Sequence, residues 1–326
     1  MTDRSTEAHS HGPETPDRGP ETSGHSLVTP DHSLEALGLA DVPALQPLTY
    51  PGRPAPGPGL LTDEALLPLA VRPGRLGTWP VGGRTDGGSG PAPSLDDVLT
   101  ALGRAATGRR HPVAAVGSNA SPGQIRYKLT RLGLPVAVPM VPVRFHGIGV
   151  AASAHISRPG FVAATPYPAP DAVVTLVVSW LERDQMEALD GTENLNYRRV
   201  LLPGDGFAMT MPSGERLPGA YVYASERGLL AGPGGAPRPG GGDQRALLSA
   251  LLSASLRLRQ VFGPGPESWV ARAGSDAALR AFGARVFAEE GWVLPPPDFP
   301  PYDGDRAGPL LHDDLPPPTG GSSTSR

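Results

Sequence analysis

The stretch VAAVGSNASPGQI, residues 113–125, contains the most informative change of pattern in the chain. It opens with a short apolar run, which the Gly-Ser-Asn sequence at 117–119 interrupts, and continues with Ser121 and Pro122, typical residues for a helix N-cap and first turn. The pattern predicts a strand, a tight polar loop and a helix that ends at Gly133. The loop amides can face an anion in this arrangement, although the same residues also suit an ordinary turn.

Downstream of that helix the sequence is dominated by strand patterns. Short Val- and Ala-rich runs lie within residues 136–150 and 161–181, and only the last of them, AVVTLVVSWL, resembles a buried strand. A short amphipathic helix is predicted over residues 182–190. Three more strand-like segments follow it, at residues 197–202, 207–211 and 217–224. These elements predict a mixed α/β (α+β) domain over residues 94–230.

The region before this domain is rich in glycine and proline, of which the chain has 43 and 41. Residues 1–30 have no apolar periodicity and are predicted to form a disordered tail. Residues 31–93 are predicted to form a Pro/Gly-rich arm, in which an apolar island at 60–71 is able to pack on the domain. Order is expected from Ser94, the N-cap of a helix of about four turns that stops near Gly108.

The region after the domain is predicted to be helical and then extended. A Gly- and Pro-rich spacer at 232–242 precedes two helices, which make residues 231–294 a C-terminal helical extension. The first helix is expected over about residues 243–262. The second is expected over about 275–291, with the serine at its start as the cap. Residues 295–326 are predicted to be an extended or disordered tail.

Charge and cysteine content exclude several classes of function. The formal net charge of −4 at pH 7 provides no basic surface for nucleic acid or for an anionic membrane. The chain has no cysteine, which excludes disulfides, thiol nucleophiles and thiolate metal sites. Residues 1–26 lack the apolar stretch of a secretory signal, and the apolar run at 172–181 is too short to span a bilayer. We therefore expect a cytoplasmic protein with no nucleic-acid or membrane partner.

A second polar segment, LDGTENLNYRRV at residues 189–200, joins the predicted helix to the next strand. Glu193 lies in its loop, where a carboxylate can act as a general base if its surroundings tune its pKa. The alternative is a solvated ion pair between Glu193 and Arg198 or Arg199. The segment by itself does not decide between the two.

Together, the two segments resemble the γ-glutamylcyclotransferase-like family. That family has a strand ending in Tyr-Gly-Ser-Asn and, further on, Leu-Asp, two residues, Glu and a Tyr-Arg-Arg strand. The matching residues here are Gly117, Ser118, Asn119, Leu189, Asp190, Glu193, Tyr197, Arg198 and Arg199. The resemblance covers residues 113–224 and implies a twisted, β-barrel-like sheet with flanking helices, in which both motifs face one pocket.

The resemblance also implies an activity. The amides of Gly117, Ser118 and Asn119 would hold a γ-glutamyl head group, and Glu193 would accept a proton from the α-amine as its nitrogen attacks the γ-carbonyl. The products would be 5-oxoproline and an amine, formed without a metal or an organic cofactor. The implied partner is a small γ-glutamyl substrate.

Val116 is the main departure from the family pattern. It stands where the family usually has tyrosine, so the motif lacks a phenol that would line the pocket. The alternative function is therefore that of a catalytically inactive member, which binds a small molecule or, through its Pro-rich arms, a protein. The retained Glu193 favours the enzyme, whereas Val116 favours the binding module.

Overall fold

Two long strands, β4 (Ala137–Ile156) and β5 (Val162–Leu181), form an antiparallel hairpin in the computed structural model, which describes residues 31–82, 91–193, 195–299 and 308–317. Each strand has 20 residues, where the sequence predicts short separate runs. The pairing continues past the irregular positions through two register shifts, one between His146 and Ile148 and one between Ala152 and Ile156. Such bulges allow a strand to absorb proline and glycine without ending.

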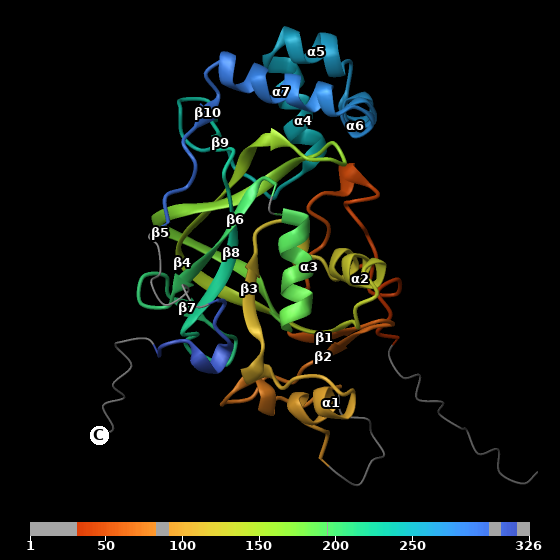
Figure 1. Ribbon diagram of the computed structural model, residues 1–326, viewed down its shortest axis with the longest axis vertical. Helices are drawn as coiled ribbons and strands as arrows, with labels where there is room; N and C mark the ends of the chain where they lie inside the picture. Colours follow the sequence, from red (N-terminus) through yellow and green to blue (C-terminus); the bar gives the residue numbers. More distant parts are fainter. Residues whose placement is uncertain (1–30, 83–90, 194, 300–307, 318–326) are drawn as a thin grey trace, which may run out of the picture. The chain divides into compact units, whose positions relative to one another are not determined.

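The other strands of the described residues are shorter and extend the hairpin into a mixed sheet. They are β1 (Gly59–Thr62), β2 (Leu66–Pro68), β3 (His111–Ala115), β6 (Tyr197–Pro203), β7 (Met209–Thr210), β8 (Gly219–Ser225), β9 (Leu229–Leu230) and β10 (Val293–Leu294). The main order is β10-β9-β4-β5-β3-β8-β6, with β3 and β8 parallel. The sheet is open and twisted, and the mixed α/β class predicted from the sequence is confirmed (Figure 1).

Helices flank the sheet, and those that follow β9 in the chain gather at one end of the β4–β5 hairpin (Figure 1). Those of the described residues are α1 (Leu95–Ala101), α2 (Pro122–Arg131), α3 (Arg183–Glu193), α4 (Gln244–Ala254), α5 (Leu256–Phe262), α6 (Pro266–Ser275) and α7 (Ala277–Glu289). Ser94 caps α1 as predicted, because its hydroxyl accepts from the amide of Asp97. The helix has 7 residues instead of about four turns, since Gly103 follows it with a φ of 69° and ends it.

The N-terminal segment, residues 31–82, packs on the sheet through its apolar island. β1 pairs antiparallel with β4, and Leu60 and Leu61 on β1 are fully buried. Upstream of β1, the amide of Ala44 donates to Oε1 of Gln124 on α2 at 3.0 Å. The segment is therefore attached both to the central hairpin and to the helix that follows the 117–119 loop.

The helices α4–α7 pack against the turn between β4 and β5. Trp269 on α6 is fully buried, and its indole N–H donates to the carbonyl oxygen of Gly160 in that turn at 3.0 Å. Gly160 has a φ of 104°, and a side chain on it would approach the backbone of Val270 to 2.9 Å. A glycine is needed at this position for both reasons.

The helical extension differs from its prediction in two details. The helix expected over 243–262 is broken at Ser255, whose side chain caps α5 by accepting from the amide of Leu258 at 3.2 Å. The last helix is capped by Asp276 and not by Ser275, which is the final residue of α6. The helix α6 itself was not predicted.

Part of the segment predicted as a C-terminal tail contacts the sheet. The amide of Leu310 donates to the hydroxyl of Tyr221 on β8 at 2.7 Å, and Leu315 is buried. The described residues from Asp31 onward form one compact unit, and the predicted domain boundaries at 94, 230 and 295 stay a prediction. The predicted N-terminal tail and residues 318–326 lie outside the described residues. Within the described ranges, no helix has the length and apolar character that crossing a membrane requires.

Candidate functional site

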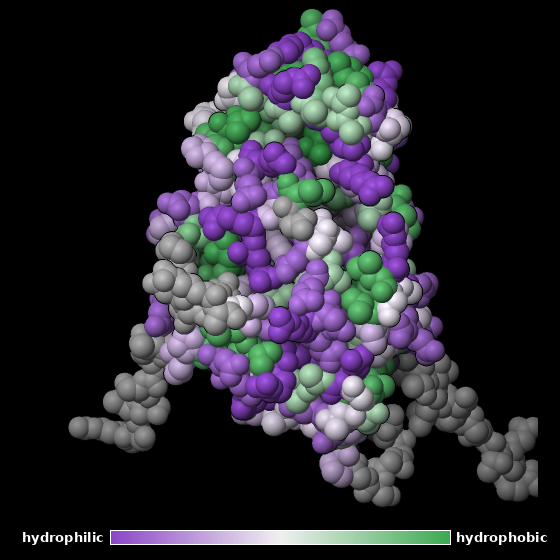
Figure 2. Space-filling model, viewed as in Figure 1, coloured by the Kyte–Doolittle hydropathy of each residue, from purple (hydrophilic) through white to green (hydrophobic). Residues whose placement is uncertain are grey.

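A cavity of about 670 Å³ opens beside the C-terminal end of α3. Its walls come from the loop after β3, from α2, from the turn between β4 and β5, and from the N-terminal segment. Figure 2 shows the surface hollowed at this place, with both hydrophilic and hydrophobic side chains around the rim. The cavity therefore contains both polar segments that the sequence singles out.

The loop at 117–119 forms one wall. β3 ends at Ala115, Gly117 precedes one 3-10 turn at residues 118–120, and this turn leads into α2, which gives the predicted order of strand, loop and helix. The backbone N–H groups of Gly117, Ser118 and Asn119 donate no hydrogen bond to another described residue. Three adjacent amides on a cavity wall are therefore available to a ligand, and such groups suit a carboxylate or a carbonyl oxygen.

Glu193, the last residue of α3, lies next to this loop. Its Oε1 accepts hydrogen bonds from Nδ2 of Asn119 at 3.2 Å and from Nζ of Lys128 at 2.9 Å. The predicted approach of Glu193 to the 117–119 loop is confirmed. Its other oxygen, Oε2, accepts no hydrogen bond from another described residue, so one oxygen is anchored and the other is available to a ligand.

Lys128 on α2, the only lysine of the chain, holds these groups together. Besides Glu193, its Nζ donates to Oδ1 of Asn119 at 2.8 Å and to Oγ1 of Thr192 at 3.0 Å. Burial acts to raise the pKa of Glu193, but the charge and hydrogen bond of Lys128, with the hydrogen bond from Asn119, outweigh it and lower that pKa. Glu193 is therefore ionised at neutral pH.

The ion pair considered from the sequence, between Glu193 and the following arginines, does not form. Arg199 pairs with Asp190, and Arg198 donates to the carbonyl oxygen of Pro297 at 3.0 Å. The cation that contacts Glu193 is Lys128, whose side chain is only 12% exposed. Both arginines of the motif therefore have partners other than Glu193, which is left to the cavity.

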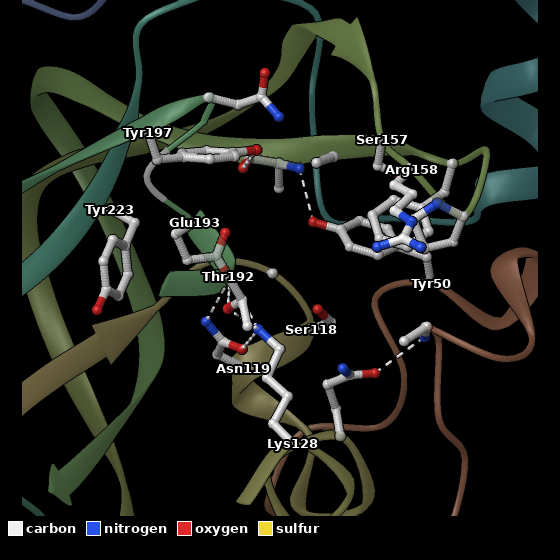
Figure 3. Close-up of a pocket in the computed structure, with 18 of the residues that line it drawn as sticks. Tyr50, Ser118, Asn119, Lys128, Ser157, Arg158, Thr192, Glu193, Tyr197 and Tyr223 are labelled. Atoms are coloured by element: carbon white, nitrogen blue, oxygen red, sulfur yellow. Dashed lines mark hydrogen bonds and ion pairs between the residues drawn. The ribbon is translucent and has the colours of Figure 1, made fainter. Parts of the chain in front are cut away.

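Tyr50, from the N-terminal segment, lines the side of the cavity that faces Glu193 and was not predicted. Its ring stacks on Phe161 at a centroid distance of 4.2 Å, and its hydroxyl oxygen accepts from the amide of Ala164 at 2.7 Å. Figure 3 shows Tyr50 and Arg158 on one side of the cavity and Glu193 with Lys128 on the other. Nothing in the Pro-rich surroundings of Tyr50 marks it as a site residue.

His155 on β4 also lines the cavity. Its Nδ1 lies 2.7 Å from Oγ of Ser153, and it packs edge-on against the ring of Tyr197. Burial lowers the pKa of His155 to about 4, so its imidazole is neutral at pH 7. His155 thus adds a polar but uncharged side chain to the cavity wall.

The charged side chains that line the cavity are mostly cationic. They are Lys128, Arg131, Arg158 and Glu193. This balance favours a ligand with at least one carboxylate. Within the described ranges, no three His, Asp or Glu side chains gather where they could hold a metal ion.

Comparisons with known proteins give only weak similarities. No protein-family model and no curated protein matches the sequence. A gamma-glutamyl cyclotransferase matches with a TM-score of 0.29 and 12% identity, over 60% of this chain and 94% of the other. A protein of Arabidopsis thaliana matches with a TM-score of 0.27 and 17% identity, over 35% of this chain. An uncharacterized protein from Homo sapiens matches with a TM-score of 0.29 and 15% identity, also over 35%.

The match spans 60% of the length of the Arabidopsis protein and 66% of the human one. Similarities of this size do not establish a family. The function must therefore be argued from the cavity and from the motifs that form it.

Proposed function

We propose that this chain releases 5-oxoproline and an amine from a γ-glutamyl amine or peptide by intramolecular aminolysis. The proposal depends on one observation: a single cavity contains an ionised Glu193 and the amides of residues 117–119, and neither Oε2 nor these amides have a hydrogen-bond partner among the described residues. The resemblance of both motifs to the γ-glutamylcyclotransferase-like family supports the same roles for Gly117, Ser118, Asn119 and Glu193.

Binding supplies much of the rate enhancement in this reaction. The amides of residues 117–119 hold the γ-glutamyl head group, and the cavity folds the substrate so that its α-nitrogen faces its own γ-carbonyl carbon. Because attacking and attacked atoms belong to one molecule, fixing their geometry replaces an encounter between two molecules. The cationic side chains of the cavity offset the negative charge of the substrate.

Glu193 moves one proton during the reaction. The α-nitrogen forms a bond to the γ-carbonyl carbon, the bond from that carbon to the leaving nitrogen breaks, and a proton passes from the first nitrogen to the second. In the proposal Oε2 of Glu193 accepts this proton and then donates it to the leaving amine. Lys128 and Asn119 anchor Oε1 and so fix the direction of Oε2. The lowered pKa of Glu193 makes its protonated form a good donor for the second transfer.

The test is release of 5-oxoproline from a panel of γ-glutamyl peptides and amines, measured with the wild type and with Glu193→Gln. Glutamine keeps the size of the side chain but cannot accept the proton, so we expect kcat to fall at least about 100-fold. Glu187→Gln is the matched control. Glu187 lies on the same helix, but it is exposed and pairs with Arg183 outside the cavity. Its variant should keep full activity, and an equal loss in both variants would contradict the role of Glu193.

A binding module without catalysis is the second candidate. Val116 in place of tyrosine favours it, and so does the Lys128 ion pair, which makes Glu193 a weaker base. The same panel distinguishes the two by calorimetry, because the module binds a γ-glutamyl compound and releases no 5-oxoproline. A protein partner recruited through the Pro-rich arms stays a prediction.

A further inference from the structure

Tyr50 places a phenol against the 117–119 loop. A methyl group on Gly117 would overlap the hydroxyl oxygen of Tyr50, so the hydroxyl lies directly on this glycine. Tyr50 belongs to the segment before β1, outside residues 113–224 that carry the family resemblance. The cavity therefore has a phenol next to the loop, although position 116 is occupied by valine and not by tyrosine.

The phenolic proton of Tyr50 has no acceptor among the described residues. The hydroxyl oxygen accepts from the amide of Ala164, and the tyrosine is 5% exposed. Tyr197 differs in this respect, because its hydroxyl donates to the carbonyl oxygen of the same Ala164 at 3.0 Å. Buried donors normally have an acceptor, so the free proton of Tyr50 at the cavity wall indicates that a ligand oxygen fits there.

The surroundings of Tyr50 suit a carboxylate in particular. Gly117, the first residue of the loop whose three amides make no hydrogen bond to the described residues, lies against its hydroxyl, and the exposed guanidinium of Arg158 lies on the same side of the cavity (Figure 3). Burial raises the pKa of Tyr50, which keeps the phenol protonated and a donor at physiological pH. Hydrogen bonds to a charged oxygen are about twice as strong as those to a neutral one.

We propose that Tyr50 donates its phenolic proton to the α-carboxylate of the γ-glutamyl group, which the amides of residues 117–119 also hold. The N-terminal segment thereby supplies the phenol that position 116 lacks, and Tyr50 becomes a residue that determines specificity for an α-carboxylate. A site built to pair with such a group discriminates strongly against ligands that lack it. This inference rests on the proposed function.

The experiment compares two substrates, γ-glutamylalanine and γ-aminobutyrylalanine, which lacks the α-carboxylate. Their relative affinities are measured in the Glu193→Gln background, where turnover is removed. Tyr50→Phe should reduce the preference for γ-glutamylalanine about tenfold, as expected for loss of a hydrogen bond to a charged group. Tyr197→Phe is the matched control, since it removes a phenol that contacts the same Ala164 but has already donated its proton. It should change the preference less than about threefold.

Gly117→Ala provides a second test of the same contact. Its methyl group displaces the Tyr50 hydroxyl, so adding Tyr50→Phe to it should cause no further loss of affinity. Additive losses would overturn the inference, and so would an unchanged preference in Tyr50→Phe. The midpoint of heat unfolding shows whether each variant is folded. If Tyr50→Phe is not folded, Gly117→Ala alone tests the contact, and an unchanged affinity for γ-glutamylalanine in Gly117→Ala overturns the inference. A wild type that releases no 5-oxoproline and binds neither compound refutes the proposed function itself.

Discussion

Replacement of Lys128 by methionine should raise the pKa of Glu193 and move the acid limb of the pH–activity profile to higher pH. Methionine keeps most of the apolar length of lysine and removes its charge. In the wild type, the ammonium group lies 2.9 Å from Oε1 of Glu193 and stabilises the ionised carboxylate. Without it, the burial that acts to raise this pKa is no longer offset by a cation at contact distance.

The size of the shift follows from the distance and the burial of the pair. At 2.9 Å, an effective dielectric constant of about 20 to 40 gives an attraction of about 3 to 6 kcal/mol. The side chains of Lys128 and Glu193 are 12% and 19% exposed, so solvent screens the pair only in part. An opposite charge at such a distance lowers a carboxyl pKa, and the hydrogen bond from Asn119 remains in the variant. We therefore expect the pKa of Glu193 to rise in Lys128→Met, because burial then acts without the opposing charge.

The assay is the pH dependence of kcat/KM for 5-oxoproline release, whose acid limb reports the pKa of the essential base in the free enzyme. Lys128→Arg is the matched control, because it keeps the positive charge and should leave the limb near its wild-type position. A ¹³C titration of the Glu193 carboxyl, assigned with Glu193→Gln, measures the same pKa without turnover. An acid limb and a carboxyl titration that are both unchanged in Lys128→Met would refute the electrostatic role of Lys128.

Three further predictions concern stability. Burial lowers the pKa of His155 to about 4, so below about pH 6.5 the unfolded chain binds a proton at this histidine that the folded chain does not bind. The free energy of unfolding therefore decreases by up to about 3 kcal/mol by pH 4, and in urea unfolding it should depend less on pH in His155→Gln than in the wild type. Ser94→Ala should cost about 1 kcal/mol in the same assay, by removing the cap of α1. Arg110→Met should lower the free energy of unfolding by about 3 kcal/mol or more, because Arg110 is fully buried and Glu182 loses its ion pair with it. A variant as stable as the wild type would contradict this prediction.

The core of the site was predictable because its signals are local. Serine and proline fix the start of α2, so the loop at 117–119 had to lie between a strand and a helix. Glu193 was expected near that loop through the combination of two motifs, and the structure brings its carboxylate to 3.2 Å from Asn119. Lys128 is conspicuous in the sequence only as the single lysine of the chain. Its partner on α3, Glu193, is 65 residues away, so no local pattern connects the two.

The remaining features depend on contacts that local patterns do not encode. Tyr50 reaches the cavity through a hydrogen bond to a residue 114 positions further along, within a segment whose composition resembles a flexible arm. The 20-residue strands β4 and β5 were divided in the prediction, because their prolines and glycines resemble turns until bulges and cross-strand pairing absorb them. Ser255 likewise resembled a helix interior, and only its capping bond to Leu258 reveals the break between α4 and α5.

The most direct test of the account identifies the product made from γ-glutamylalanine by mass spectrometry. Intramolecular aminolysis predicts 5-oxoproline and alanine in equal amounts, formed by the wild type and reduced at least about 100-fold in Glu193→Gln. Attack by water would instead give glutamate and alanine. Glutamate as the product, or 5-oxoproline formed equally well by Glu193→Gln, would contradict the assignment of Glu193 and its cavity to this reaction.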